Sequence, residues 1–154
     1  MTTAEGTRVP DLTLVDQDGT PVSLRELAGS TVVLYFYPKD STPGCTTQAC
    51  DLRDNWELFE DRDDVLLFGV SPDGEASHRK FRDRHDLPFP LLVDEDHRLA
   101  DAFGFWVEKK MYGKTFHGVE RSTVVIAPDG TVQAVLRKVK PSEHVQLLRD
   151  ELGL

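Results

Sequence analysis

The run Thr-Val-Val-Leu-Tyr-Phe-Tyr-Pro, residues 31–38, most constrains how this chain can fold. Its side chains are apolar or aromatic at almost every position, whereas a strand with one face in water alternates apolar with polar residues. Such a strand is buried on both faces, so it belongs in the middle of a sheet that is covered from both sides. Two further runs, 65–70 and the proline-flanked 89–94, indicate additional buried strands.

Amphipathic segments lie between these strands. A helix is expected to begin near Gly44; in its body, residues 46–61, apolar side chains recur every three or four positions and form one buried stripe. The stripe consists of Ala49, Leu52, Trp56 and Phe59. Further helices are expected in residues 75–86, 94–104 and 141–152.

Two hairpins complete the pattern, each with an Asp-Gly pair at its turn, in residues 12–24 and 122–137. Residues 105–120 show no clear period and are expected to form a loop or an irregular segment. Strands that alternate with helices and end in a hairpin predict an α/β fold, with a central mixed β-sheet, helices on both faces and an N-terminal β-hairpin. At this length we expect a single domain over residues 1–154.

The charge balance argues against two classes of partner. With 18 basic and 27 acidic residues, the formal net charge of −9 opposes binding to nucleic acid or to an anionic membrane surface. The chain has no apolar run near the roughly 20 residues that span a bilayer, and its first twelve residues lack the apolar core of a signal peptide. We therefore expect a cytoplasmic protein, whose cysteines stay thiols unless they serve redox chemistry or bind metal.

The only two cysteines, Cys45 and Cys50, lie in one segment, Pro-Lys-Asp-Ser-Thr-Pro-Gly-Cys-Thr-Thr-Gln-Ala-Cys (residues 38–50). This segment follows the carboxyl end of the predicted central strand, where open α/β sheets place reactive groups. Cys45 falls in the first turn of the predicted helix, whose unpaired N–H groups and positive dipole end favour a thiolate. The hydroxyl of Thr42 can reach the sulfur or a bound oxygen. These features predict a reactive thiolate, although a cysteine at a helix start can also be a small buried hydrophobic residue.

The spacing of the two cysteines argues against a permanent disulfide. Five residues of intact helix separate the Cα atoms by about 8.7 Å, whereas a disulfide requires about 7 Å or less. The two thiols can therefore pair only if the start of the helix unwinds. This suits a cycle in which Cys45 becomes a sulfenic acid, Cys50 condenses with it, and an external dithiol reduces the disulfide.

Other cysteine chemistries fit the sequence less well. The chain has no Cys-x-x-Cys pair of the thioredoxin type, and a zinc site would need about four ligands at closer spacing. A cysteine hydrolase would need a histidine base, for which His117 is the only candidate. The other histidines lie in charged helices and are expected at the surface; they are His78, His85, His97 and His144.

Residues 38–50 resemble the active-site segment of peroxiredoxins, whose pattern is Pro-x-x-x-Thr/Ser-x-x-Cys. The Cys-x₄-Cys spacing is similar to that of the bacterioferritin comigratory protein, or peroxiredoxin Q, subfamily. Residues 105–130 resemble a later segment of the same subfamily, with its Gly-Lys-Thr stretch and Arg-Ser-Thr strand start, and the similarity covers nearly the whole chain. The resemblance implies a thioredoxin-like fold and thiol-dependent reduction of hydrogen peroxide and organic hydroperoxides.

The resemblance also implies roles for individual residues. Cys45 corresponds to the peroxidatic cysteine and Cys50 to the resolving cysteine. Thr42 would hydrogen-bond the sulfur and the peroxide, Pro38 would shield the pocket, and Arg121 would place its guanidinium beside the thiolate. The sequence itself supports Arg121, because a charge at the start of a hydrophobic strand lacks a packing reason, although a surface salt bridge would also explain it.

Gly44 and Gln48 are expected to line the substrate site by the same resemblance. The family uses no metal, haem or flavin, so no cofactor is expected. Electrons would come from thioredoxin or a similar dithiol protein, and the chain is expected to be a monomer.

Two alternatives to a rapidly turning-over peroxidase remain open from the sequence. A thioredoxin-like binding module without redox turnover would show ordinary alkylation kinetics at Cys45. A peroxide sensor or thiol-dependent chaperone would undergo the same oxidation but would be recycled slowly.

Overall fold

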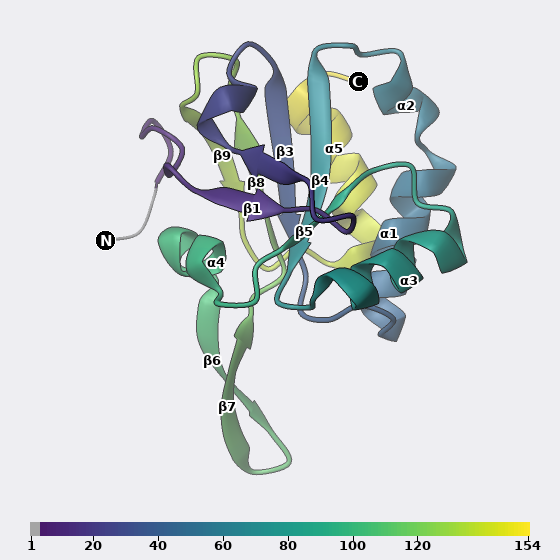
Figure 1. Cartoon of the computed structure of the whole chain (residues 1–154), viewed down its shortest axis with the longest axis vertical. Helices are drawn as coiled ribbons and strands as arrows, with labels where there is room; N and C mark the ends of the chain where they lie inside the picture. The colour runs from purple at the N-terminus through teal and green to yellow at the C-terminus, as the bar shows by residue number, and fades with distance from the viewer. Residues whose placement is uncertain (1–3) are drawn as a thin grey trace.

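The computed structural model describes residues 4–154 and shows a mixed sheet with helices on both faces (Figure 1). The sheet has the strand order β2-β1-β5-β4-β3-β8-β9. These strands are β1 (Thr13–Val15), β2 (Pro21–Ser23), β3 (Thr31–Phe36), β4 (Val65–Ser71), β5 (Leu91–Val93), β8 (Ser122–Ile126) and β9 (Val132–Leu136). Strands β6 (Trp106–Met111) and β7 (Lys114–Val119) form a separate antiparallel pair. The predicted α/β fold and N-terminal β1–β2 hairpin are confirmed.

Strand β3 lies between β4 and β8 near the middle of the sheet, and every one of its residues is buried. It runs parallel to β4 and antiparallel to β8. Its side chains alternate between the two cores: Val32, Leu34 and Phe36 enter one hydrophobic cluster, whereas Val33 and Tyr35 enter the other. This alternation explains why both faces of the segment are apolar, as a period of two requires.

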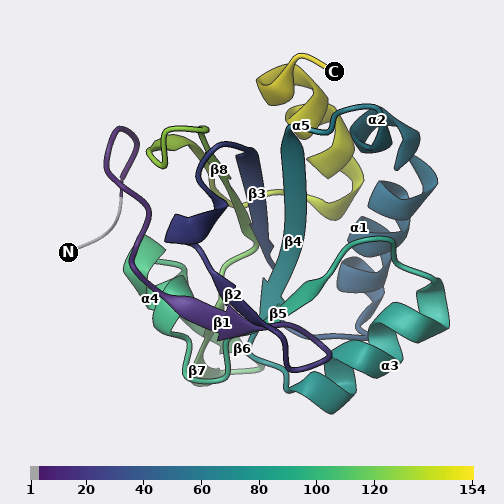
Figure 2. The same cartoon turned by 45° about the horizontal axis from the view of Figure 1, so that its top comes forward.

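The helices are α1 (Pro43–Asp54), α2 (Glu57–Glu60), α3 (Glu75–His85), α4 (Arg98–Phe103) and α5 (His144–Leu152), with 3₁₀ turns at Arg25–Leu27 and Pro141–Glu143. Helices α1, α3 and α5 cover one face of the sheet, and α4 covers the other (Figure 2). In the last helix Leu148 is fully buried, and Val145 and Leu152 pack against the same core. Within residues 4–154, none of the helices is long and apolar enough to cross a membrane.

The helix predicted to run from near Gly44 through residues 46–61 is interrupted in the structure. Helix α1 ends at Asp54, and the Asn55 side chain donates a hydrogen bond from Nδ2 to the carbonyl of Asp51 at 2.8 Å. Asparagine competes in this way for helical carbonyls and so favours helix ends. The apolar stripe still packs inward, because Phe59 of the short α2 is buried and Trp56 stacks on it.

Residues 105–120 are not irregular, which corrects the prediction for this segment. They contain the β6–β7 pair, whose turn residues Tyr112 and Gly113 both have positive φ, 53° and 76°. Two consecutive turn residues with positive φ are typical of the type I′ turn, which two-residue hairpins favour. A Tyr-Gly turn lacks the Asn-Gly or Asp-Gly signature, and the exposed strands lack a buried face that would impose alternation.

The helix expected in residues 94–104 is shorter than predicted, because its start is set by a carboxylate. Asp94 is buried and accepts hydrogen bonds from the backbone N–H groups of Leu99 and Ala100 at 3.1 and 3.0 Å. Helix α4 therefore begins at Arg98, with Asp94 satisfying two of its otherwise unpaired donors.

Candidate active site

Cys45 occupies the first turn of α1, which follows the carboxyl end of β3 after the loop of residues 37–42. Thr42 precedes the helix in an extended conformation and Pro43 is its first residue, a position that tolerates proline because no N–H is needed there. The sulfur accepts a hydrogen bond from Nη2 of Arg121 at 3.3 Å. Arg121, which the family resemblance predicted beside the thiolate, therefore hydrogen-bonds the thiol of Cys45.

Strand pairing brings Arg121 to Cys45. Strands β3 and β8 are antiparallel with Phe36 opposite Ser122, so Arg121, immediately before β8, adjoins the chain that leaves β3 toward α1. Gly44 permits the close approach, because a Cβ at this position would lie 3.2 Å from Nη2 of Arg121. Gly44 therefore has a steric role next to the guanidinium.

The side chain of Cys45 is almost fully buried, with 1% of its surface exposed, and it packs within the core that contains Ala49 and Leu52. A cysteine in purely apolar surroundings is an inert structural thiol. Here the guanidinium of Arg121 and the start of α1 supply positive potential at the sulfur. The sulfur therefore has a positively charged hydrogen-bond partner that a structural cysteine in purely apolar surroundings lacks.

Gln48 extends the polar contacts away from the sulfur and into the interior. Its side chain is fully buried; Oε1 accepts from Nη1 of Arg121 at 2.6 Å, and Nε2 lies 3.0 Å from Nδ1 of His144. Because the amide nitrogen can only donate, Nδ1 of His144 is the acceptor and the ring proton sits on Nε2, 2.8 Å from Oγ1 of Thr123. Burial first, and then the charge of Arg121, lower the pKa of His144 from 6.5 to about 3.

The prediction that His144 lies at the surface is wrong, and so is that for His78; both side chains are fully buried. His85 and His97 are only partly exposed. The charged composition of these helices concealed which histidines face inward. A usable signal exists for His144, because Leu148 and Leu152 follow it at helical spacing on the same inner face.

Thr42 and Pro38 flank the entrance to α1. The hydroxyl of Thr42 donates to the carbonyl of Lys39 at 2.8 Å, so it has only lone pairs left for another partner. In this arrangement the hydroxyl can accept a hydrogen bond but does not donate one to the sulfur of Cys45. Pro38 is partly buried in the loop between β3 and α1.

Cys50 lies in the same intact helix as Cys45, is partly buried, and is also a free thiol. The end of α1 beyond it is tied down: Leu52 is fully buried, and Nη1 of Arg53 donates to the carbonyl of His85 at 2.7 Å. With the helix formed, five residues keep the two Cα atoms about 8.7 Å apart. The structure therefore represents the dithiol form, with the two sulfurs unable to bond.

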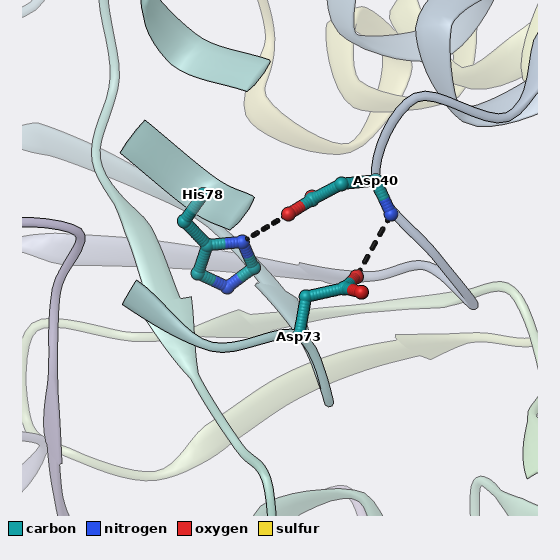
Figure 3. Close-up of side chains that lie close together, drawn as sticks. All are labelled: Asp40, Asp73 and His78. Atoms are coloured by element: carbon teal, nitrogen blue, oxygen red, sulfur yellow. Dashed lines mark hydrogen bonds and ion pairs between the residues drawn. The ribbon is translucent and has the colours of Figure 1, made fainter. Parts of the chain in front are cut away.

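The loop that leads into α1 is braced by a buried hydrogen bond between Asp40 and His78 (Figure 3). The carboxylate of Asp40 accepts from the Tyr37 hydroxyl at 2.6 Å, from Ser77 at 2.8 Å and from Nδ1 of His78 at 2.7 Å. The Asp40 backbone N–H donates to Oδ2 of Asp73 at 2.8 Å. These contacts join the loop to β4 and α3, so the residues that precede Cys45 have a fixed position.

Asp40, Asp73 and His78 are close enough together to suggest a metal site, but their hydrogen bonds do not fit one. Nε2 of His78 faces the carbonyl of Leu92 at 2.8 Å, and Nδ1 faces the Asp40 carboxylate. Both ring nitrogens of His78 are therefore taken up by protein partners, and neither faces an open position for a cation. The cluster is a hydrogen-bonded brace, and we assign it no metal.

The histidine base of a cysteine hydrolase finds no support in this geometry. His117 is exposed on β7, opposite Glu108 in the hairpin register. The hydrogen-bond partner of the Cys45 sulfur, within the described part of the chain, is a guanidinium that cannot act as a base. The site lacks the nucleophile–base pair that acyl transfer requires.

Arg121→Met should slow the reaction of Cys45 with hydrogen peroxide about 10- to 100-fold, because a hydrogen bond to a charged group contributes about 1.5–3 kcal/mol. The second-order rate constant should be measured by stopped flow, together with alkylation by iodoacetamide at pH 6, which should slow in parallel. Arg79→Met, at an exposed position of α3, is the matched control and should leave both rates unchanged. An unchanged peroxide rate in Arg121→Met would contradict the role of this contact.

Comparison with known proteins agrees with this geometry. A model of the AhpC/TSA family matches residues 6–135. The peroxiredoxin Bcp of Bacillus subtilis (strain 168) is 49% identical over 154 residues, covering 97% of this chain and 98% of the relative. The peroxiredoxin Bcp of Escherichia coli (strain K12) is 44% identical over 139 residues, covering 90% and 88%.

Solved structures give the same result. The bacterioferritin comigratory protein of Xanthomonas campestris, studied for its alkyl peroxide reduction activity, superposes with a TM-score of 0.89 at 39% identity, covering 97% of this chain and 98% of the other. A PrxQ mutant of Xylella fastidiosa superposes with a TM-score of 0.91 at 31% identity, covering 99% and 97%. The chain therefore belongs to the AhpC/TSA family as a peroxiredoxin of the Bcp, or peroxiredoxin Q, type, and it is a peroxidase with a thioredoxin-like fold.

Proposed function

We propose that the Cys45 thiolate attacks the terminal oxygen of hydrogen peroxide or an organic hydroperoxide. A new S–O bond forms as the O–O bond breaks, and water or an alcohol leaves after taking up a proton. The sulfur is oxidised to a sulfenic acid while the peroxide is reduced. The observation that carries the proposal is the 3.3 Å hydrogen bond from Arg121 to the Cys45 sulfur at the start of α1, since it favours the anionic nucleophile.

Cys50 completes the cycle in this proposal. Its thiol attacks the sulfur of the sulfenic acid, water leaves, and an intramolecular Cys45–Cys50 disulfide forms. The start of α1 must unwind first, because the folded helix holds the two residues too far apart. A dithiol protein of the thioredoxin type then supplies two electrons by thiol–disulfide exchange and becomes a disulfide itself.

The substrate class is supported by the relatives and by the burial of the sulfur. The Xanthomonas campestris protein is described by its alkyl peroxide reduction activity. Only 1% of the surface of Cys45 is exposed, so neighbouring side chains leave little room for a bulky group beside the sulfur. We infer that hydrogen peroxide and hydroperoxides with an unbranched –CH₂–O–OH end are reduced faster than tertiary hydroperoxides.

A titration of the reduced protein with hydrogen peroxide tests this cycle. One equivalent should remove both thiols, and peptide mass mapping should find Cys45 linked to Cys50 within one chain, with a loss of helical circular dichroism. In Cys50→Ser, one equivalent should instead give a sulfenic acid on Cys45 that dimedone traps. A disulfide between chains, or a Cys45 that stays reduced, would overturn the proposal.

Steady-state turnover separates a peroxidase from a peroxide sensor with the same oxidation chemistry. With thioredoxin, thioredoxin reductase and NADPH, we expect many turnovers per chain at a rate close to that of a single oxidation cycle. Oxidation followed by recycling over minutes would indicate a sensor. A Cys45 with the alkylation rate of a free cysteine would indicate a binding module.

A further inference from the structure

The hydrogen bond between Gln48 and His144 joins the part of α1 that must unwind to a part of the fold that need not move. Gln48 lies between the two cysteines in the sequence, so bringing Cys45 and Cys50 together displaces its side chain. His144 begins α5 on the same face of the sheet. Both side chains are fully buried, and Nε2 of Gln48 lies 3.0 Å from Nδ1 of His144. Unwinding α1 must therefore break this bond.

The bond exists only with a neutral imidazole. Oε1 of Gln48 is already committed to Arg121, so its amide nitrogen faces His144 and Nδ1 must provide a lone pair. A proton on Nδ1 would set two donors against each other in a buried site, which costs free energy. The unprotonated ring of His144 therefore makes this hydrogen bond, and a protonated ring opposes it.

The charged and titratable groups around His144 come from several elements of the fold. Arg121, which precedes β8, brings a positive charge that disfavours an imidazolium. Tyr35 of β3 packs against the ring with centroids 5.3 Å apart, and burial, followed by the charge of Cys45 in α1, raises its pKa well above 10. On its own side His144 follows the exposed Glu143. With α1 folded, the neutral ring is strongly preferred.

We propose that the Gln48–His144 hydrogen bond is a pH-sensitive latch on α1, in which the neutral histidine holds the helix folded and its protonation favours the unwound form that pairs Cys45 with Cys50. This inference rests on the proposed disulfide cycle. It makes His144 a positioning residue, which acts on the two cysteines through Gln48 and α1.

The direction of the pH effect follows from proton binding. In the folded arrangement the pKa of His144 is about 3, whereas a ring uncovered by unwinding approaches its usual value near 6.5. The unwound form binds the extra proton between these values, so the latch is at full strength above about pH 6.5 and weakens as the pH falls. Each pH unit below 6.5 shifts the equilibrium about tenfold toward unwinding.

His144→Asn isolates this effect, because its Oδ1 can replace Nδ1 as the acceptor for Gln48 but cannot take up a proton. The measured quantity is the rate of Cys45–Cys50 disulfide formation after one equivalent of hydrogen peroxide, by rapid quench with N-ethylmaleimide between pH 5 and 8. The ratio of wild-type to variant rates cancels the ionisation of Cys50, which both proteins share. We expect this ratio to be constant above pH 6.5 and to rise about tenfold per pH unit below it.

Two further measurements keep the test decisive. His117→Asn, at an exposed histidine of the β6–β7 hairpin, should show a constant ratio over the whole range. NMR of the wild-type imidazoles needs no variant: in the reduced protein His144 should remain an Nε2–H tautomer down to pH 5, and in the disulfide form it should titrate near pH 6.5. A flat rate ratio for His144→Asn, or a His144 that titrates near 6.5 in the reduced protein, would overturn the latch.

The outcomes also separate the latch from the cycle on which it rests. If the disulfide forms within one chain but its wild-type to variant rate ratio is flat, the latch is wrong and the peroxidase cycle stands. If no intramolecular disulfide forms at any pH, both are wrong.

Discussion

Replacing Cys45 by serine should abolish peroxidase turnover. A serine hydroxyl is not ionised at neutral pH and cannot take an oxygen atom from a peroxide. In this variant the guanidinium of Arg121 would face a neutral hydroxyl in place of the sulfur. Removal of a covalent nucleophile lowers activity by on the order of 10³-fold or more. Hydrogen peroxide consumption, coupled to thioredoxin and NADPH, should fall to the background rate of the reductants.

The control for this experiment is built into the chain. Cys50→Ser changes the same atoms in the same helix, yet it should retain a single rapid oxidation per chain and lose only the subsequent cycle. Both variants should keep the thermal stability of the wild type within a few degrees. Substantial turnover in Cys45→Ser would mean that another group reacts with peroxide, and the assignment of the nucleophile would be wrong.

Asp40→Ala should destabilise the fold by about 3–5 kcal/mol, a large share of the total stability of a domain this size. The substitution leaves the Tyr37 hydroxyl and the His78 ring as buried donors without their acceptor. Equilibrium unfolding in guanidinium chloride under reducing conditions measures the change. The midpoint should fall while the slope stays constant, because the loss concerns the native state.

Matched substitutions show whether the loss comes from the buried pair. Asp83→Ala, at an exposed position of α3, should change the free energy of unfolding by no more than about 0.5 kcal/mol. In a double-mutant cycle, Asp40→Ala and His78→Ala together should cost less than the sum of the two single losses. A loss below about 1 kcal/mol for Asp40→Ala would show that the brace contributes little.

The sequence was sufficient for the parts of the fold and the site that depend on local pattern. The two-sided apolar character of residues 31–38 predicted a central strand, and β3 is buried at every position. Cys45 and Arg121 could be paired through a family resemblance, and the antiparallel register of β3 and β8 provides the physical reason for their contact. Local pattern and resemblance thus identified the thiol and its guanidinium.

The inner contacts of the site could not be found in this way, because they depend on which face of a helix turns inward. His78 and His144 lie in sequences that are rich in charge, yet each is enclosed by groups from several elements. The helical spacing of Leu148 and Leu152 is a local signal that His144 faces inward, but its partners Gln48 and Thr123 cannot be read from its neighbours in the sequence. Similarly, the break after Asp54 follows from one side-chain hydrogen bond of Asn55, which an apolar stripe that continues to Phe59 conceals.

Hydrogen bonds fix both ends of helix α1. Asp40 holds the loop that precedes the helix, and Arg53 joins its last turn to the end of α3. If residues 43–50 lose their helical turns while both ends stay fixed, the contour length of the segment increases from about 12 Å to about 26 Å. The distance between its two ends does not increase. The extra length of roughly 14 Å cannot be accommodated along the sheet, so the unwound segment must project into water. In the oxidised protein the disulfide would therefore lie in a projecting loop. Another protein of similar size to this chain could reach it there.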